Sequence, residues 1–263
     1  MEETPLRPEL LGAHVPWAQI HQHLDSILDL GLIPEIAFKG PDLDTLDLQR
    51  LETVAKTLKN VPRRPTIHAP FFDLNPGAID PLIQQATRQR LMQTLDAAEV
   101  LGAHLVVVHP GFDRWRYPGL EEAWINQAQM FFPPLLKTAE KIDCRLALEN
   151  IYEETSSSLV LLVNALDSPW FGHCFDAGHW FLFGREPMVD WLTKISSKLF
   201  HLHLHDNHGT SDDHHPLGEG LVDFELLFTH VLSLPHKPSM TLEAHSSEDL
   251  IRSLEALKAL WPE

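Results

Sequence analysis

The fold is decided by PTIHAP at residues 65–70 and HLVVVH at residues 104–109, two short apolar runs that a helical pattern over residues 81–101 separates. Short runs rich in β-branched and apolar residues, bounded by proline or glycine, are typical of buried strands. Pro81 suits the first turn of a helix, and Gly102 suits its C-terminal end. Together the segments predict a strand, a helix and a second strand that runs parallel to the first.

The same alternation continues along the chain. The predicted strands cover residues 10–15, 33–38, 65–70, 104–109, 145–150, 172–176, 199–206 and 239–244. The predicted helices cover residues 43–58, 81–101, 121–142 and 187–197, with others ending near Gly31, opening after Ser156–Ser158 and following the last two strands. Eight strand–helix units predict an α/β fold, a single (β/α)8 TIM barrel that occupies residues 1–263 as one domain.

The composition limits how a ligand can be held. The opening residues Met1–Pro5 (MEETP) are acidic where a secretory signal is basic, and no apolar stretch approaches the roughly 18 residues of a spanning helix. We therefore expect a cytoplasmic protein without a membrane partner. The only cysteines are Cys144 and Cys174, which excludes a disulfide framework and a cysteine-rich zinc module. A bound metal must then be held by His, Asp and Glu.

The charge bears on the kind of substrate. The chain carries 20 Lys and Arg against 37 Asp and Glu, a net charge of −17. Proteins that bind long nucleic acids use basic residues to replace counterions along the phosphates, so this balance makes DNA an unfavourable partner. Two or three bound divalent ions would change the net charge to roughly −13 to −11, so the chain would remain acidic with the ions bound. We expect a small-molecule substrate.

Imidazole and carboxylate side chains gather at the C-terminal ends of predicted strands three to eight or in the loops just beyond, which is the catalytic face of a TIM barrel. The candidate metal ligands are His68, His109, Glu149, Asp176, His179, His203, Asp212, His214 and Glu243. A lone buried His is more often a hydrogen-bonded core residue, and a strand-terminal Glu can simply cap a helix. Burying all of them together without cations would be costly, so we predict two or three divalent ions, zinc first, with manganese or iron as alternatives.

The seventh predicted strand carries three alternating histidines, His201, His203 and His205. Side chains two residues apart point to the same side of a strand, so all three are expected to face the barrel interior. One of them can be a ligand while its neighbours orient the substrate or fill the mouth.

Two further motifs, GAHV at residues 12–15 and DDHHPLGEG at residues 212–220, extend the pattern over nearly the whole chain. In order and type the motifs resemble the xylose isomerase-like barrels of the endonuclease IV superfamily, AP endonuclease family 2. The resemblance implies one ion on His68, His109 and Glu149, a second on Glu149, Asp176, His203 and Glu243, and a third on His179, Asp212 and His214. Related sugar isomerases and epimerases keep chiefly the second set and use carboxylates for proton transfer. Glu149 and Glu243 are the candidate catalytic residues.

DLNPGAID at residues 73–80 and HPGFDRWRY at residues 109–117 resemble, more narrowly, the cobamide-remodelling phosphodiesterases of this superfamily. Those enzymes hydrolyse the phosphodiester that joins the corrin ring side chain to the nucleotide loop. The substrate-binding candidates are then Arg114, Trp115, Arg116, Asn150 and His215. Asn150 and His215 are equally expected to support the ligands, and the loop at 114–117 is also consistent with a surface loop anchored by its tryptophan.

The preferred function is a divalent-metal-dependent phosphodiesterase that acts on a small phosphodiester, with a cobamide as the candidate substrate. Clustered cations activate water and stabilise the attacking and leaving oxygens. The main alternative is a sugar or sugar-phosphate isomerase or epimerase. An AP endonuclease and a non-catalytic metal or corrinoid-binding barrel are further alternatives. The discriminating residues, which the resemblance places outside the isomerase set, are His68, His109, Asp212 and His214.

Overall fold

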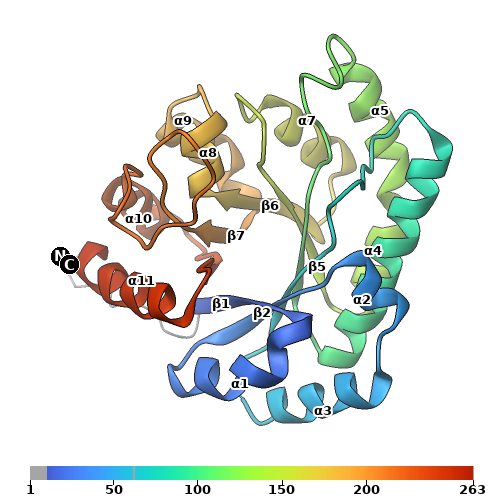
Figure 1. The fold of residues 1–263 in the computed structure, drawn as a ribbon. Helices are drawn as coiled ribbons and strands as arrows, with labels where there is room; N and C mark the ends of the chain where they lie inside the picture. The colour runs from blue at the N-terminus through green and yellow to red at the C-terminus, as the bar shows by residue number, and fades with distance from the viewer. Residues whose placement is uncertain (1–10, 62, 263) are drawn as a thin grey trace.

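Eight parallel strands close into a barrel in the computed structural model, which describes residues 11–61 and 63–262 (Figure 1). The strands are β1 Leu11–Pro16, β2 Ile33–Ala37, β3 Thr66–His68, β4 Leu105–Val108, β5 Arg145–Glu149, β6 Phe171–Asp176, β7 Leu199–Leu204 and β8 Ser239–Leu242. Each strand pairs with its neighbour in sequence, and β1 closes the barrel against β8. The predicted (β/α)8 TIM barrel is confirmed. The first predicted strand began at residue 10, which lies outside the described residues.

Helices surround the barrel and connect its strands (Figure 1). They are α1 Ile20–Asp29, α2 Gly40–Asp44, α3 Leu48–Leu58, α4 Pro81–Leu101, α5 Glu121–Phe131, α6 Pro133–Lys141, α7 Ser157–Leu166, α8 Ala177–Phe183, α9 Met188–Ile195, α10 Phe224–Ser233 and α11 Ser247–Leu260. Short 3₁₀ turns, η2 Trp17–Gln19 and η3 Ser196–Lys198, precede α1 and β7.

The strands bury both of their faces. On β4, Val106 and Val108 join the large apolar cluster between sheet and helices, whereas Leu105 and Val107 belong to a separate small cluster. Because side chains alternate along a strand, this small cluster is the filling of the barrel interior. A parallel sheet covered by helices needs such near-continuous apolar strands, so the polar residues at the strand ends stand out.

The predicted helix over residues 121–142 is wrong as a single element. It is two helices, because α5 ends at Phe131 and α6 begins at Pro133. Proline has no backbone N–H to donate, and its ring clashes with the carbonyl four residues earlier, so the chain turns there.

The predicted helix over residues 43–58 also divides. The second part, α3, begins after Asp47, whose carboxylate accepts hydrogen bonds from the backbone N–H groups of Gln49 and Arg50. An N-cap of this kind satisfies amides that have no partner within the helix, so it starts a new helix at that point.

Within the described residues, no helix is both long and apolar enough to cross a membrane.

A buried histidine on the outer face of β6 makes stability depend on acidity. Burial, reinforced by the charge of Lys198, lowers the pKa of His173 to about 3. The unfolded chain takes up this proton near pH 6.5 and the folded chain does not, so the free energy of unfolding falls as the pH drops from 6.5 toward 3. We predict that His173→Leu reduces the loss of stability between pH 7.5 and pH 5 by about 2 kcal/mol. Urea unfolding of both proteins at the two pH values in a chelator measures this, and equal losses would contradict it.

Candidate metal centre

The nine predicted ligands come together at one end of the barrel. His68, Glu149 and Asp176 are the last residues of their strands, and His109 and Glu243 follow β4 and β8 directly. Parallel strands of a barrel all end on the same face, which is why residues far apart in the chain meet there. The side chains form overlapping groups whose ligand atoms lie within 4.8 Å of one another: His68–His109–Glu149, His68–His203–Glu243, Glu149–Asp176–His203, and His179–His205–Asp212–His214.

Glu149 occupies the centre of the cluster and is 1% exposed. Its Oε2 lies 3.3 Å from Nε2 of His68 and 3.1 Å from Nε2 of His109. Its Oε1 lies 3.3 Å from Nδ1 of His179 and 3.2 Å from Nδ1 of His203. One carboxylate therefore faces imidazoles of different groups through its two oxygens, as a carboxylate that bridges two cations would.

His203 faces three carboxylates through a single nitrogen. Its Nδ1 lies 3.2 Å from Glu149, 3.7 Å from Asp176 and 3.4 Å from Glu243. This nitrogen is buried, yet it makes no hydrogen bond of good geometry to any described residue. Buried polar atoms are rarely left unpaired, and a donor set of imidazole with several carboxylates suits a divalent ion. The residues therefore fit a metal at this position.

A further group, around Asp212, lies beside the groups around Glu149 and His203. Nε2 of His179 lies 3.2 Å from Oδ2 of Asp212, and Nε2 of His214 lies 3.4 Å from the same oxygen. His205, which was not among the predicted ligands, joins this group with its Nδ1 3.8 Å from Asp212. Its ring stacks on that of His214 with centroids 3.8 Å apart. The alternation of histidines on β7 was the signal that pointed to it.

The turn from β6 into α8 positions two members of the cluster. Asp176 caps α8, and its Oδ1 accepts a hydrogen bond of 2.6 Å from the backbone N–H of His179. Between them, Gly178 lies against the ring of His205, where an added Cβ would be 2.1 Å from a ring carbon. Only glycine permits this approach, so the spacing of the motif at 176–179 follows from the packing of the β7 end.

The long loop after β7 is held in place by Asp206. Its carboxylate accepts hydrogen bonds from the backbone N–H groups of Gly218, Gly220 and Val222 at 2.8–3.0 Å. His214 lies within this loop in a left-handed conformation with φ of 51°. Such a conformation is uncommon for a residue with a side chain and persists where surrounding contacts fix it. The motif at residues 212–220 thus builds the loop that brings its own ligands to the mouth.

A carboxylate below the cluster faces His203. Glu35 on β2 is fully buried, and its Oε1 lies 2.9 Å from Nε2 of His203. Its Oε2 lies 3.0 Å from Nε2 of His201 and accepts a 2.9 Å hydrogen bond from the hydroxyl of Thr66. With Nε2 facing Glu35, Nδ1 is the nitrogen of His203 that faces the cluster. Sequence reasoning missed Glu35, although an acid within the apolar run at 33–38 was a signal.

We predict that Glu35→Gln weakens the affinity of the cluster for zinc by roughly 10- to 100-fold, because His203, a candidate ligand, loses the carboxylate that faces its other nitrogen. Competition titration against a chromophoric chelator measures this affinity. The matched control is Glu186→Gln, which removes another buried carboxylate, one that accepts hydrogen bonds from Ser156 and pairs with Lys194 away from the cluster. Equal affinities in the Glu35 variant and the wild type would show that His203 does not depend on this contact.

The charges of the cluster stabilise one another. Burial alone would raise the pKa of Glu149, but the imidazoles of His109 and His203 hold that pKa well below its usual range. Burial likewise disfavours a charge on His214, yet the hydrogen bond with Asp212, together with Glu243, raises the pKa of His214 to about 9. A cation that binds here must displace such protons, so its affinity falls as the pH is lowered.

The remaining predicted residues lie in different surroundings. Asn150 is buried and exchanges two hydrogen bonds of 2.9 Å with the backbone of Asp176, so its amide ties the end of β5 to the end of β6. His215 exchanges backbone hydrogen bonds with Asp206 at the edge of the loop, and its Nε2 lies 3.8 Å from Asp213. The Asn150 side chain thus joins two strand ends, whereas the His215 side chain is partly exposed within its own loop.

The two arginines of the loop at 114–117 lie in different surroundings. Arg114 pairs with Glu154 and lies over the ring of Trp115, which is 61% exposed. Arg116 lines a cavity of about 520 Å³ above the cluster. This cavity is also lined by His68, Glu149, His214 and aromatic residues such as Phe71. Its size suits a small organic ligand, and Arg116 is the cation of the loop that reaches it.

Known proteins share this architecture. The family described as xylose isomerase-like TIM barrel matches residues 33–260. A probable endonuclease 4 of Mycobacterium leprae is 26% identical over 243 residues, 84% of this chain and 88% of that protein. The structure of TTHB071 protein from Thermus thermophilus, soaked with ZnCl2, is 27% identical with a TM-score of 0.82, covering 95% of this chain and 97% of that one. A D-tagatose 3-epimerase-like protein shares the fold at 22% identity with a TM-score of 0.83, and the match covers 95% of this chain and 96% of that one. The chain belongs to the xylose isomerase-like TIM barrel family.

Proposed function

We propose that the protein is a divalent-metal-dependent phosphodiesterase that acts on a small phosphodiester. The observation that carries the proposal is the group His179, His205, Asp212 and His214, which stands beside the groups around Glu149 and His203. A site for one ion needs only the four candidate ligands Glu149, Asp176, His203 and Glu243. Several adjacent cations suit phosphodiester cleavage, in which negative charge develops on more than one oxygen.

Bound divalent ions would supply an activated water and stabilise the oxygens of the phosphoryl group. The residues of the chain would hold the ions and limit the access of water to the ligands. Glu149, His203 and Glu243 offer ligand atoms from rigid strand ends. The ring of Phe71 stacks on His109 with centroids 4.3 Å apart, so it covers one side of this ligand against water. Support of this kind keeps ligands in the geometry that a reaction needs.

The structural relatives support metal binding by this chain, since one of them was soaked with ZnCl2 and is 27% identical over nearly its whole length. Zinc is the ion that we propose first, with two or three ions per chain, and manganese or iron accept the same ligands. A cobamide is the substrate that the motifs at 73–80 and 109–117 favour. In support, Asp73, Asp113 and Arg116 from these motifs line the cavity above the cluster.

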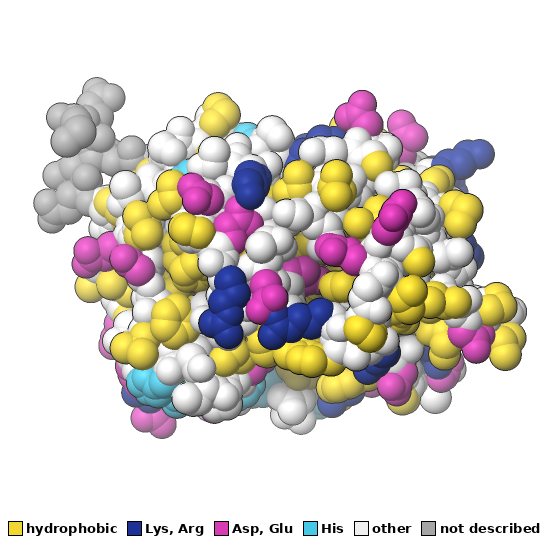
Figure 2. Space-filling view, turned by 90° about the horizontal axis from the view of Figure 1, so that it is seen from above, with side chains coloured by type: hydrophobic (Ala, Val, Ile, Leu, Met, Phe, Trp, Pro, Cys, Tyr) yellow, Lys and Arg dark blue, Asp and Glu magenta, His cyan; other side chains and the backbone are white. Residues whose placement is uncertain are grey.

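Charge argues against DNA as the substrate. The net charge is −17, and on the face in Figure 2 the described Lys and Arg side chains lie interspersed with acidic and apolar ones. A protein that follows a duplex needs several phosphate contacts along a continuous basic surface. The likeness to a probable endonuclease 4 therefore supports phosphodiester hydrolysis more than it supports DNA as the substrate.

A sugar epimerase is the second candidate. The observation that favours it is the pair of carboxylates, Glu149 and Glu243, that face the same nitrogen of His203 at 3.2 and 3.4 Å. Two carboxylates beside one ion could move a proton from and to a carbon next to a carbonyl. This candidate gives the group around Asp212 no role in the reaction, so we place it second.

One experiment separates the candidates. The protein, reconstituted with zinc or manganese, is incubated with bis(p-nitrophenyl) phosphate, a cobamide, D-tagatose and an abasic DNA duplex at physiological salt. We expect hydrolysis of the small diesters alone. Epimerisation of the sugar without any hydrolysis would overturn the proposal, and incision of DNA without turnover of a small diester would restore the endonuclease alternative.

We predict that Arg116→Ala raises the KM for a small phosphodiester by roughly 10-fold, because one charge-assisted hydrogen bond to a phosphate oxygen is lost. The kcat and the metal content should stay unchanged, since Arg116 lines the cavity and faces Asp113 at 3.5 Å rather than a predicted ligand. Arg185→Ala is the matched control, because Arg185 is similarly exposed and faces Glu154 at 3.7 Å. A KM equal to that of the wild type would remove Arg116 from the binding site.

A further inference from the structure

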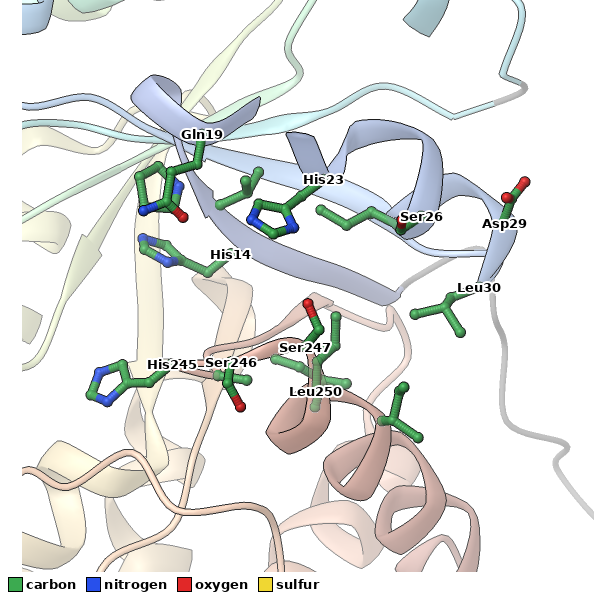
Figure 3. A pocket seen from close by; sticks show the side chains of 16 residues that line it. His14, Gln19, His23, Ser26, Asp29, Leu30, His245, Ser246, Ser247 and Leu250 are labelled. Carbon is green, nitrogen blue, oxygen red and sulfur yellow. The ribbon is translucent and has the colours of Figure 1, made fainter. Parts of the chain in front are cut away.

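A second cavity, of about 590 Å³, lies between α1 and α11, beside the mouth of the barrel (Figure 3). Its walls include Ile27 of α1, Leu30 just after that helix, and Leu250 and Ile251 of α11. Leu30 is 39% exposed and Ile251 is 46% exposed. Apolar side chains of adjacent helices normally cover one another, so an open, apolar cavity of this size between two helices is a candidate binding site.

The cavity adjoins the metal centre. His14 and His245 line both this cavity and the one above the cluster. The ring of His14 meets that of His68 edge-on with centroids 6.1 Å apart, and the ring of His245 stacks on that of His214 at 4.7 Å. In Figure 3 both rings lie at the same end of the cavity. The two cavities therefore share the wall that these two rings form, on the side of the metal centre that faces α1 and α11.

The lining defines the chemistry of the occupant. Apolar side chains alternate with the neutral amide and hydroxyl groups of Gln19 and Ser246, and Lys and Arg are absent from the described residues that line the cavity. The one carboxylate of the lining, Asp29, lies among the residues at the end away from His14 and His245 (Figure 3). The lining thus has no permanent positive charge from its described residues, and its polar groups include hydroxyls, an amide and the imidazoles of His14, His23 and His245. It suits an uncharged ring that gains from apolar burial and from contact with flat imidazoles.

We propose that this cavity binds an uncharged aromatic group of the substrate, attached to the phosphodiester held at the metal centre. The inference rests on the proposed function for the phosphodiester part and on the cavity itself for the aromatic part. The reacting phosphorus lies over the cluster, and the ester group that is not released extends past His14 and His245 toward Leu250.

The kinetic test compares two diesters with the same leaving group, phenyl p-nitrophenyl phosphate and methyl p-nitrophenyl phosphate. We expect kcat/KM to be roughly 10- to 100-fold higher for the phenyl ester, because about one aromatic ring is removed from water. Leu250→Trp and Ile251→Trp, which place a large ring in the cavity, should abolish this preference and leave the methyl ester unaffected. Leu161→Trp is the matched control, since Leu161 is 58% exposed on α7. An equal kcat/KM for the two esters in the wild type would overturn the inference.

A binding test stands apart from catalysis. The uncharged fluorophore N-phenyl-1-naphthylamine is titrated into the reconstituted protein. We expect saturable binding that Leu250→Trp and Ile251→Trp both weaken at least 10-fold and Leu161→Trp does not. If this holds while neither diester is hydrolysed, the cavity is an aromatic-binding site and the proposed function is wrong. If the fluorophore does not bind, or binds all variants equally, the cavity inference is wrong whatever the activity.

Discussion

Replacement of Glu149 by Gln is expected to lower the hydrolysis of a small phosphodiester by roughly 10³-fold or more, since loss of a single electrostatic contact to a transition state already costs roughly 10²–10³. Glu149 faces four imidazoles through two oxygens, so an amide in its place would lose a negative charge shared by two groups of ligands. The metal content should fall by more than one ion per chain. Steady-state kinetics and elemental analysis of the same preparation measure both effects.

The control for this variant is Glu186→Gln. Glu186 is also a buried carboxylate, but it accepts hydrogen bonds from Ser156 and pairs with Lys194 away from the cluster. Its replacement should change stability and leave the metal content as it was. A Glu149→Gln protein that keeps its ions and most of its activity would show that Glu149 does not bridge.

Replacement of His109 by Ala is expected to reduce phosphodiester hydrolysis by roughly 10²-fold, the order that one electrostatic contact contributes, and to remove one ion per chain. His109 belongs to the group with His68 and Glu149 and is absent from the group around Asp176 and His203. The fold should persist, because the strand ends rest on the filled barrel interior. Circular dichroism, elemental analysis and kinetics together measure these outcomes.

The same variant separates the two candidate functions. An epimerase that uses only one ion, beside His203, would keep its activity without His109. His208→Ala is the control, because His208 is an exposed histidine of the loop after β7 and lies against His215. Phosphodiester hydrolysis equal to that of the wild type in the His109 variant would show that His109 has no role as a ligand.

The barrel and the place of the candidate ligands could be predicted because both follow from local pattern. Apolar runs such as residues 104–109 identify strands, and parallel strands of a barrel end on one face. A His or Glu at the end of such a run must therefore meet its counterparts from the other strands. Helix limits depend on more than the apolar pattern, and the division at Pro133 shows that a proline outweighs a continuous helical pattern.

The tertiary contacts between residues that are distant in the sequence could not be predicted. His205 joins Asp212 only because the carboxylate of Asp206 gathers the backbone of the loop after β7. Glu35 meets His203 only because the barrel brings β2 opposite β7 across its interior. The pairing of Arg114 with Glu154, which directs this arginine away from the cavity that Arg116 lines, is likewise a tertiary contact. None of these has a sequence spacing that would reveal it.

The central claim is that the cluster holds more than one ion. Its most direct test is elemental analysis of wild-type protein that has been stripped with a chelator, reconstituted with excess zinc or manganese and freed of loosely bound metal by gel filtration. We predict two or three ions per chain, in keeping with the adjacent groups of ligands around Glu149, His203 and Asp212. A reproducible limit of one ion per chain would contradict the claim and favour the epimerase.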